Sequence, residues 1–164
     1  SIFELKPNFG RSLITAFGRV AGRSVGFVAS QPVIYAGALS PDACDKATAF
    51  LSLCDANNIP LIFMQDTPGF MVGRQVEHDN LLAKAIRFAE ALALVEVPRL
   101  TVVMRKAFGL AYFSLSGSSM GGRAVAASRR RSRGSYQGRC RAPRGKRAVA
   151  VTRVTRVSGR SGRR

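Results

Sequence analysis

Residues 60–73 read PLIFMQDTPGFMVG, and residues 98–112 read PRLTVVMRKAFGLAY. In both stretches a proline precedes an apolar run, which is followed by a loop that contains glycine. Proline disfavours helical geometry in the residue before it, and a continuous apolar run is typical of a fully buried strand in a parallel sheet. The pattern recurs after 38 residues. This repeat predicts a layered α/β fold with catalytic loops at the carboxyl ends of the strands.

The sequence around these strands predicts two longer helices. Ser40, Pro41 and Asp42 combine a hydroxyl N-cap, a proline at the first helical position and an acid at the positive end of the helix dipole. Apolar residues then recur with a helical period over residues 43–54. From Gln75 onward the same period predicts one helix of about five turns.

The segment before these helices predicts a β-hairpin. Residues 13–17 and 25–29 are rich in strand-forming residues, and the sequence between them, GRVAGRS, contains glycines that permit a tight reversal. The same segment is one residue short of a phosphate-binding loop and has arginine where that motif requires lysine, so we favour the hairpin.

Side chains that commonly carry chemistry are scarce in this sequence. The single histidine, His78, lies at the polar start of a predicted helix, and we assign it no catalytic role. Cys44, Cys54 and Cys140 lack the spacing of a zinc site or a disulfide framework, and we expect reduced thiols, no metal and a cytoplasmic protein. Asp66 could act as an acid or a metal ligand, but we interpret it as a turn former. No apolar run is long enough to cross a membrane.

The remaining candidate for chemistry is the backbone. In RKAFGLAYF, residues 105–113, a predicted strand ends in a loop that opens a helix of small residues from about Gly109. The first N–H groups of a helix are unpaired and lie at the positive end of its dipole, so they can stabilise a developing oxyanion. Taken alone, the same pattern also describes an ordinary connection between a strand and a helix.

Four motifs in a fixed order remove this ambiguity. The chain resembles the C-terminal half of the carboxyltransferase β subunits of propionyl-CoA, acetyl-CoA and related acyl-CoA carboxylases. The resemblance is carried by SLITAFGRVAGRSVGFVASQP (12–32), LSPDACDKATAFLSLCDANNIPLIFMQDTPGF (39–70), VGRQVEH (72–78) and PRLTVVMRKAFGLAY (98–112).

This resemblance implies a crotonase-type layered fold built from ββα units. It also implies transfer of a carboxylate from carboxybiotin, borne by a biotin carboxyl carrier or biotin carboxylase subunit, to the α-carbon of an acyl-CoA. A biotin-dependent decarboxylase of the same family is an alternative that the sequence does not separate. We expect the intact protein to be a homo-oligomer.

The resemblance also assigns site residues. Leu110 and Ala111 match the second glycine and the alanine of the family's RKAYGGAY-like segment, whose backbone amides, with Gly109 beside them, hold the ureido oxygen of biotin. Leucine in place of glycine keeps the backbone donor but narrows the approach. Phe113 matches a position that lines the acyl pocket. Four further residues match segments near the biotin ring, although each also suits a plain turn: Gln31, Pro68, Gly69 and Phe70.

The last 42 residues differ sharply from the rest of the chain. Arg123 to Arg164 carry 15 of the 26 cations and none of the 9 anions. We therefore divide the chain into a partial biotin-facing domain (1–122) and an arginine-rich tail (123–164), expected to be disordered. We favour translation out of frame over an evolved nucleic-acid-binding arm, because the break falls inside a domain.

The chain begins with Ser1 within structured-looking sequence, which suggests a fragment. We expect this fragment to be inactive alone. It would lack the acyl-CoA domain and a dimer partner that supplies the other face of the site.

Overall fold

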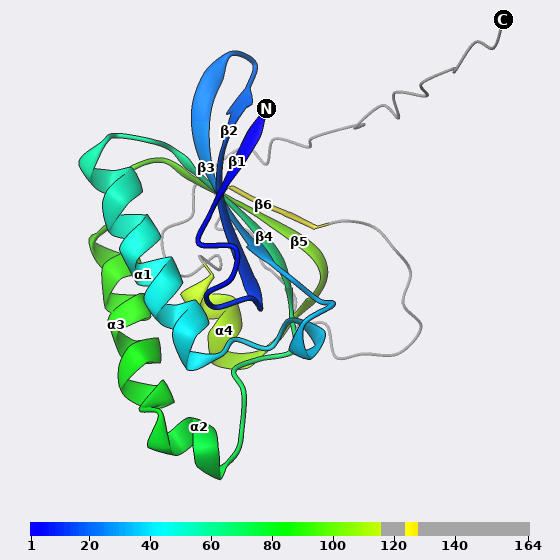
Figure 1. Cartoon of the computed structure of the whole chain (residues 1–164). Helices are drawn as coiled ribbons and strands as arrows, with labels where there is room; N and C mark the ends of the chain where they lie inside the picture. Colours follow the sequence, from blue (N-terminus) through cyan, green and yellow to red (C-terminus); the bar gives the residue numbers. More distant parts are fainter. Residues whose placement is uncertain (116–123, 128–164) are drawn as a thin grey trace, which may run out of the picture.

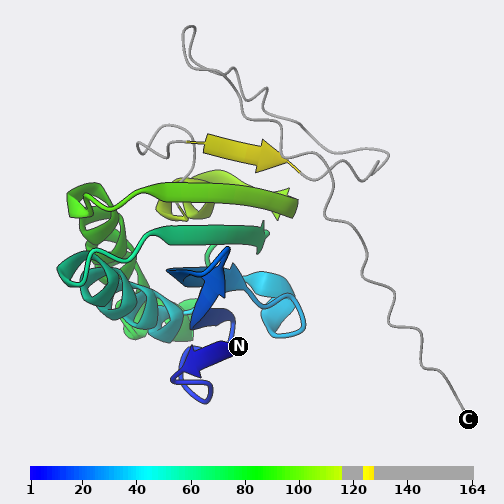
Figure 2. The ribbon, with the colours of Figure 1, turned by 90° about the horizontal axis from the view of Figure 1, so that it is seen from above.

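The computed structural model describes residues 1–115 and 124–127, in which one mixed sheet of six strands has the order β1-β2-β3-β4-β5-β6. β1 (Ile2–Leu5), β2 (Leu13–Val20) and β3 (Arg23–Ser30) are antiparallel neighbours. β3, β4 (Leu61–Thr67), β5 (Arg99–Ala107) and β6 (Ala124–Ala127) are parallel. The helices α1 (Pro41–Ala56) and α3 (Leu81–Leu94) pack side by side against one face of this sheet (Figures 1 and 2). The predicted α/β class is confirmed.

The predicted hairpin is formed by β2 and β3. Its two turn residues, Ala21 and Gly22, both have positive φ, at +50° and +80°. Such turns match the right-handed twist of the flanking strands. β1, which the sequence did not predict, pairs with the outer edge of β2 and leaves Ile2 and Phe3 exposed.

The helix α1 begins and ends where the sequence predicts. The side-chain oxygen of Ser40 accepts the backbone N–H of Ala43 at 3.2 Å, and Pro41 occupies the first helical position. Asn57 ends the helix, and Pro60 separates it from β4. This sharp stop sets the length of the crossover that makes β4 parallel to β3.

The single helix predicted from Gln75 is wrong, because the structure contains two. α2 (Arg74–His78) ends at Asp79, and Asn80 adopts the left-handed conformation, with φ +58°, before α3 begins. Asparagine tolerates this conformation better than most residues, so the interruption between α2 and α3 costs little free energy. None of the helices in the described part of the chain is long and apolar enough to cross a membrane.

The change of direction between α2 and α3 at Asn80 allows α3 to pack against α1 and the sheet. Ala85, Phe88 and Leu92 of α3 are buried in the core. On the rim of this interface, Lys84 of α3 pairs with Asp45 of α1 at 2.7 Å.

The parallel strands are covered on one face rather than two. Along β4, Leu61 and Phe63 are buried against the helices, whereas the alternating residues Ile62 and Met64 are only half-buried. Successive side chains of a strand point to opposite faces, and among the described residues helices cover one face alone. The prediction of fully buried strands therefore fails for every second residue.

Four residues of the predicted tail are ordered in the sheet. Ala124–Ala127 form β6, which pairs with β5 in register from Leu100↔Ala124 to Val103↔Ala127. A short uncharged run can complete the hydrogen bonds of a strand edge, and the expectation that the tail is mostly disordered stays a prediction. The remaining residues, 128–164, lie outside the described residues, so the nucleic-acid and out-of-frame hypotheses stay predictions.

Both cysteines in the described part of the chain are free thiols in the core. Burial raises the pKa of Cys44 and of Cys54 from 9.0 to about 12, and Asp45 adds to the effect at Cys44. Neither group is a thiolate at neutral pH, so neither is suited to nucleophilic chemistry. Cys140 lies outside the described residues.

Lys46 is an unusual core residue, because its side chain is only 2% exposed. Its ammonium donates a hydrogen bond of 2.8 Å to the carbonyl of Leu13, which joins α1 to the start of β2. Burial lowers the pKa of this ammonium, an effect that Glu4 opposes and Lys6 reinforces.

This burial predicts a specific dependence of stability on pH. Between the lowered pKa of Lys46 in the folded chain and its ordinary value of 10.5, the unfolded chain binds more protons than the folded chain. The contribution of Lys46 to the free energy of unfolding therefore rises with pH over this range. In urea unfolding from neutral pH to about pH 10, the native chain should gain free energy of unfolding relative to Lys46→Met. The buried cysteines lower the free energy of unfolding in this range, but both proteins contain them, so their effect cancels in the difference. A pH-independent difference would contradict the prediction.

Candidate functional site

Three connecting segments meet at one edge of the sheet, where the parallel strands β3, β4 and β5 end. Residues 31–39, which include the short helix η1 (Tyr35–Gly37), follow β3. Residues 68–73 follow β4, and β5 leads through Phe108 into α4 (Gly109–Ser114), as Figure 1 shows. Ligand sites of parallel sheets lie at this edge. Every site residue predicted from the sequence belongs to one of these three segments.

The first two segments are hydrogen-bonded to each other. The N–H of Leu39 donates to the carbonyl of Gly69 at 3.0 Å, and the N–H of Met71 donates to the carbonyl of Leu39 at 2.9 Å. Gly37 lies against the end of β4 with φ +86°, and a Cβ atom there would approach the carbonyl oxygen of Asp66 to 2.3 Å. Only glycine fits this contact, so Gly37 determines how closely the two segments approach.

The four predicted biotin contacts lie in these two segments, and three of them have structural roles there. The side-chain oxygen of Gln31 accepts the N–H of Val33 at 3.4 Å. The N–H of Gly69 donates to Oγ1 of Thr67 at 3.2 Å, and Phe70 packs against the core. Pro68, by contrast, is exposed. The structure brings these residues to one edge, and their contact with biotin remains a prediction.

Asp66 holds β5 rather than its own turn. Oδ1 of Asp66 accepts hydrogen bonds from Nε of Arg105 at 3.2 Å and from the backbone N–H of Lys106 at 3.3 Å. Oδ2 of Asp66 forms an ion pair with Nη2 of Arg105 at 3.2 Å. The interpretation of Asp66 as a turn former is therefore corrected. Thr67, whose hydroxyl also donates to the carbonyl of Gly69 at 3.1 Å, stabilises the turn instead.

The third segment presents the backbone donors that the sequence predicts. Gly109, Leu110 and Ala111 are the first three residues of α4, and their N–H groups have no acceptor among the described residues. Phe108, the N-cap, makes no side-chain capping bond. Gly109 has φ +60° with open space beyond it, and Leu110 is 54% exposed. The start of α4 is thus able to bind an oxygen that carries negative charge.

The predicted acyl-pocket residue, Phe113, lies on the same short helix. It is half exposed, and its ring meets that of Tyr112 edge-on at 5.6 Å between centroids. This places an aromatic surface one helical turn from the backbone donors.

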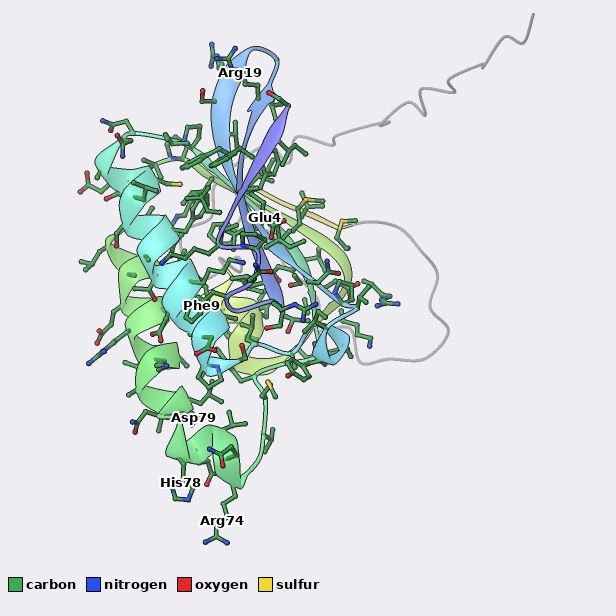
Figure 3. The ribbon with its side chains drawn as sticks, viewed as in Figure 1. Glu4, Phe9, Arg19, Arg74, His78 and Asp79 are labelled. Atoms are coloured by element: carbon green, nitrogen blue, oxygen red, sulfur yellow. The ribbon has the colours of Figure 1, made fainter. Side chains whose placement is uncertain are left out.

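Other regions contribute less to a site. His78 lies on α2 near Arg74, at the end of the molecule away from the sheet, as Figure 3 shows. A hollow of about 370 Å³ lies at the opposite, amino end of β4 and β5 and is lined by Pro60, Pro98 and their neighbours. Among the described residues there is no group of three or more acidic, histidine or cysteine side chains suited to a metal.

The fold and the site together define a class. The chain is a mixed α/β layer whose carboxyl sheet edge carries the backbone N–H groups that open α4. The chain belongs to the carboxyl transferase domain family, whose model matches residues 1–136. The predicted family is confirmed, and the match extends beyond the boundary that we predicted at residue 122.

Individual relatives share this segment. The chain is 39% identical over 125 residues to the propionyl-CoA carboxylase beta chain of Rhodococcus erythropolis. The aligned region covers 76% of this chain and 26% of that relative. It is 39% identical over 124 residues to the methylmalonyl-CoA decarboxylase subunit alpha of Propionigenium modestum, with 76% and 24% covered. The chain therefore spans about a quarter of the length of these relatives.

A solved structure gives the same result in three dimensions. The 12S subunit of transcarboxylase, crystallised as a hexamer with hydrolysed methylmalonyl-coenzyme A, superposes with a TM-score of 0.76 at 41% identity. The match covers 77% of this chain and 25% of that chain. The mixed sheet and its helices therefore have the architecture of a carboxyltransferase.

Sequence reasoning missed several residues that shape the site. Gly37 and Arg105 act through contacts with β4, and nothing in their local sequence indicates those partners, whereas Thr67 bonds to Gly69 within its own turn. Gln65 gave a signal that was overlooked. It is a polar residue inside an apolar strand, and such a residue needs a hydrogen-bond partner when buried.

The contact at Gly37 predicts a measurable difference between two glycine substitutions. Gly22 has nearly the same φ, +80°, but open space beyond it, so Gly22→Ala should lower the free energy of unfolding by about 1 kcal/mol. Gly37→Ala adds an overlap with the carbonyl of Asp66 and should cost about 2 to 4 kcal/mol. Urea unfolding of both variants measures the difference, and equal losses would contradict the proposed contact.

Proposed function

We propose that this chain supplies the biotin-facing oxyanion site of a biotin-dependent acyl-CoA carboxyltransferase. The observation that carries this proposal is the cluster of unpaired N–H groups of Gly109, Leu110 and Ala111 at the start of α4. Their position in a segment matched by the carboxyl transferase domain model supports the assignment. The proposal concerns the full-length protein, because the chain spans about a quarter of its relatives.

The residues fit the chemistry that biotin would bring. Carboxybiotin supplies an activated carboxylate, whose release leaves negative charge on the ureido oxygen. The amides of Leu110 and Ala111 would hold that oxygen, and because they are fixed in a helix they need no reorganisation as charge develops. No side-chain acid or base is required for this role.

Neighbouring residues would surround the ring system. Gln31, Pro68, Gly69 and Phe70 lie in segments that are hydrogen-bonded together at the same edge, and we propose that they border the biotin. Phe113 would line the acyl side. Backbone donors and an apolar border suit a ligand with one polar, urea-like end.

The partners follow from the same assignment. We propose that biotin arrives on a carrier or biotin carboxylase subunit and that an acyl-CoA occupies the facing wall. A homo-oligomer would supply that wall, and the hexamer formed by the 12S relative supports this arrangement. At the start of α4, Gly109 and Leu110 are exposed and Ala111 behind them is buried, which is compatible with a site completed by another segment on the side of Gly109 and Leu110.

A decarboxylase is the second candidate, and the similarity to the methylmalonyl-CoA decarboxylase subunit favours it specifically. Both reactions place charge on the same ureido oxygen, so the amides of α4 serve either direction. Product analysis separates the two: net formation of a carboxylated acyl-CoA from carboxybiotin supports the carboxylase. Net release of CO₂ from the carboxylated acyl-CoA supports the decarboxylase.

The site predicts a strong effect of one backbone change. In a full-length carboxyltransferase subunit whose matching quarter is replaced by this segment, Leu110→Pro removes one N–H donor while proline remains tolerated in the first helical turn. Carboxyl transfer should fall by about a hundredfold or more, the usual cost of one oxyanion donor.

Leu110→Ala is the matched control, because it removes the same side chain and keeps the N–H. We expect it to retain carboxyl transfer within about tenfold of the unsubstituted subunit, since the backbone donor is unchanged. Full activity of a folded Leu110→Pro subunit would overturn the assignment of the oxyanion donors.

A further inference from the structure

Two consecutive residues of β4, Gln65 and Asp66, bind the two ends of the segment that carries the proposed oxyanion donors. Their side chains point to opposite faces of the sheet, because successive residues of a strand alternate. Asp66 contacts the segment where it leaves β5, and Gln65 contacts it where α4 ends. The amides of Gly109 to Ala111 lie between these two points of attachment.

The attachment at the entry compensates for an irregularity in the sheet. Gln65 pairs with Val103 and Thr67 pairs with Ala107, so β5 has three residues opposite the single residue Asp66. Such a bulge bends a strand and removes regular partners for its backbone. Oδ1 of Asp66 accepts the N–H of Lys106 inside this bulge, at 3.3 Å. A side chain thus replaces a ladder bond at the point where β5 turns towards α4.

The backbone contact of Asp66 matters more than its ion pair. The side chain of Asp66 is 13% exposed, whereas that of Arg105 is 58% exposed. An ion pair with one exposed partner is weakened by water and salt, while the sheltered bond to the N–H of Lys106 is not. The carboxylate oxygen is therefore needed as an acceptor, and its charge is secondary.

The attachment at the exit holds a helix that is too short to be stable alone. α4 has six residues. Its last carbonyls have no partner within the helix. The side-chain Nε2 of Gln65, which is fully buried, donates to the carbonyls of Leu115 and Tyr112. Oε1 of Gln65 has no partner among the described residues, so this amide acts by donation alone.

We infer that Gln65 and Asp66 are positioning residues, which hold residues 105–115 at both ends and thereby set the direction of the amides of Leu110 and Ala111. This inference rests on the proposed oxyanion role of those amides. Neither side chain touches the reacting groups in this scheme. Each acts through the backbone of α4, and an error of about 1 Å in the placement of such groups is enough to cost about a hundredfold in rate.

The first test measures geometry without any activity. In the ¹⁵N-labelled 164-residue chain, Asp66→Ala and Gln65→Leu should shift the amide resonances of Gly109, Leu110 and Ala111. Asp66→Asn keeps an acceptor for Lys106 and should leave these resonances close to those of the native chain. Asp45→Asn, which removes the 2.7 Å ion pair with Lys84 and no bond to residues 105–115, is the matched control for loss of a carboxylate and should also leave them unchanged.

The second test measures the kinetic consequence in the full-length grafted subunit. Asp66→Ala and Gln65→Leu should lower kcat for carboxyl transfer by about a hundredfold with KM for the acyl-CoA nearly unchanged. Asp66→Asn should restore most of the kcat, and added salt should not abolish that rescue. If Asp66→Asn lowered kcat as much as Asp66→Ala does, the proposed role of the side-chain oxygen as an acceptor would be wrong.

The two proposals fail in different ways. If Leu110→Pro is inactive while Asp66→Ala and Gln65→Leu keep full kcat and native amide resonances, the positioning inference is wrong and the oxyanion site stands. If the resonances shift as expected but Leu110→Pro keeps full activity, the two residues still hold α4, and the proposed function is wrong.

Discussion

The structure depends on the hydrogen bonding of β4 along both of its edges. β4 pairs in parallel with β3 on one side and with β5 on the other, so three strands end at the same edge of the sheet. Parallel neighbours require crossover connections, and α1 and α3 provide them while covering one face. The segments that follow the three strands are thereby collected at one place. Without this register the motifs would be distant stretches of chain with no common site.

The chemistry of the site arises from the main chain, and this explains several features together. A helix start offers N–H donors whatever side chains it carries, so leucine at position 110 is compatible with the proposed oxyanion role. Side chains are then free to act as supports. Asp66, Gln65 and Gly37 all have roles of this kind, because each determines where a backbone group lies. The proposed site would serve a carboxylase or a decarboxylase equally, since charge would develop on the same ureido oxygen in either direction.

Prediction from sequence succeeded where the signal was local. The N-cap at Ser40, the proline before β4 and the start of a helix near Gly109 were all found, because each depends on neighbouring residues. It failed where the conformation of a single residue breaks a periodic pattern, as at Asn80 between α2 and α3. The four residues of β6 were not predicted as a strand, because their pairing depends on the edge of β5 rather than on their own composition.

The sequence alone was enough to predict β2 to β5, α1 and the family, because hydrophobic period, capping residues and ordered motifs are properties of contiguous chain. Only the tertiary structure decided what holds the backbone donors of α4 in place. The bulge in β5, the bond from Lys106 to Asp66, the contact of Gly37 with β4 and the donation from Gln65 to α4 all join residues that are far apart in the chain. Such contacts follow from strand register, which is set by packing of the whole sheet and leaves no local trace.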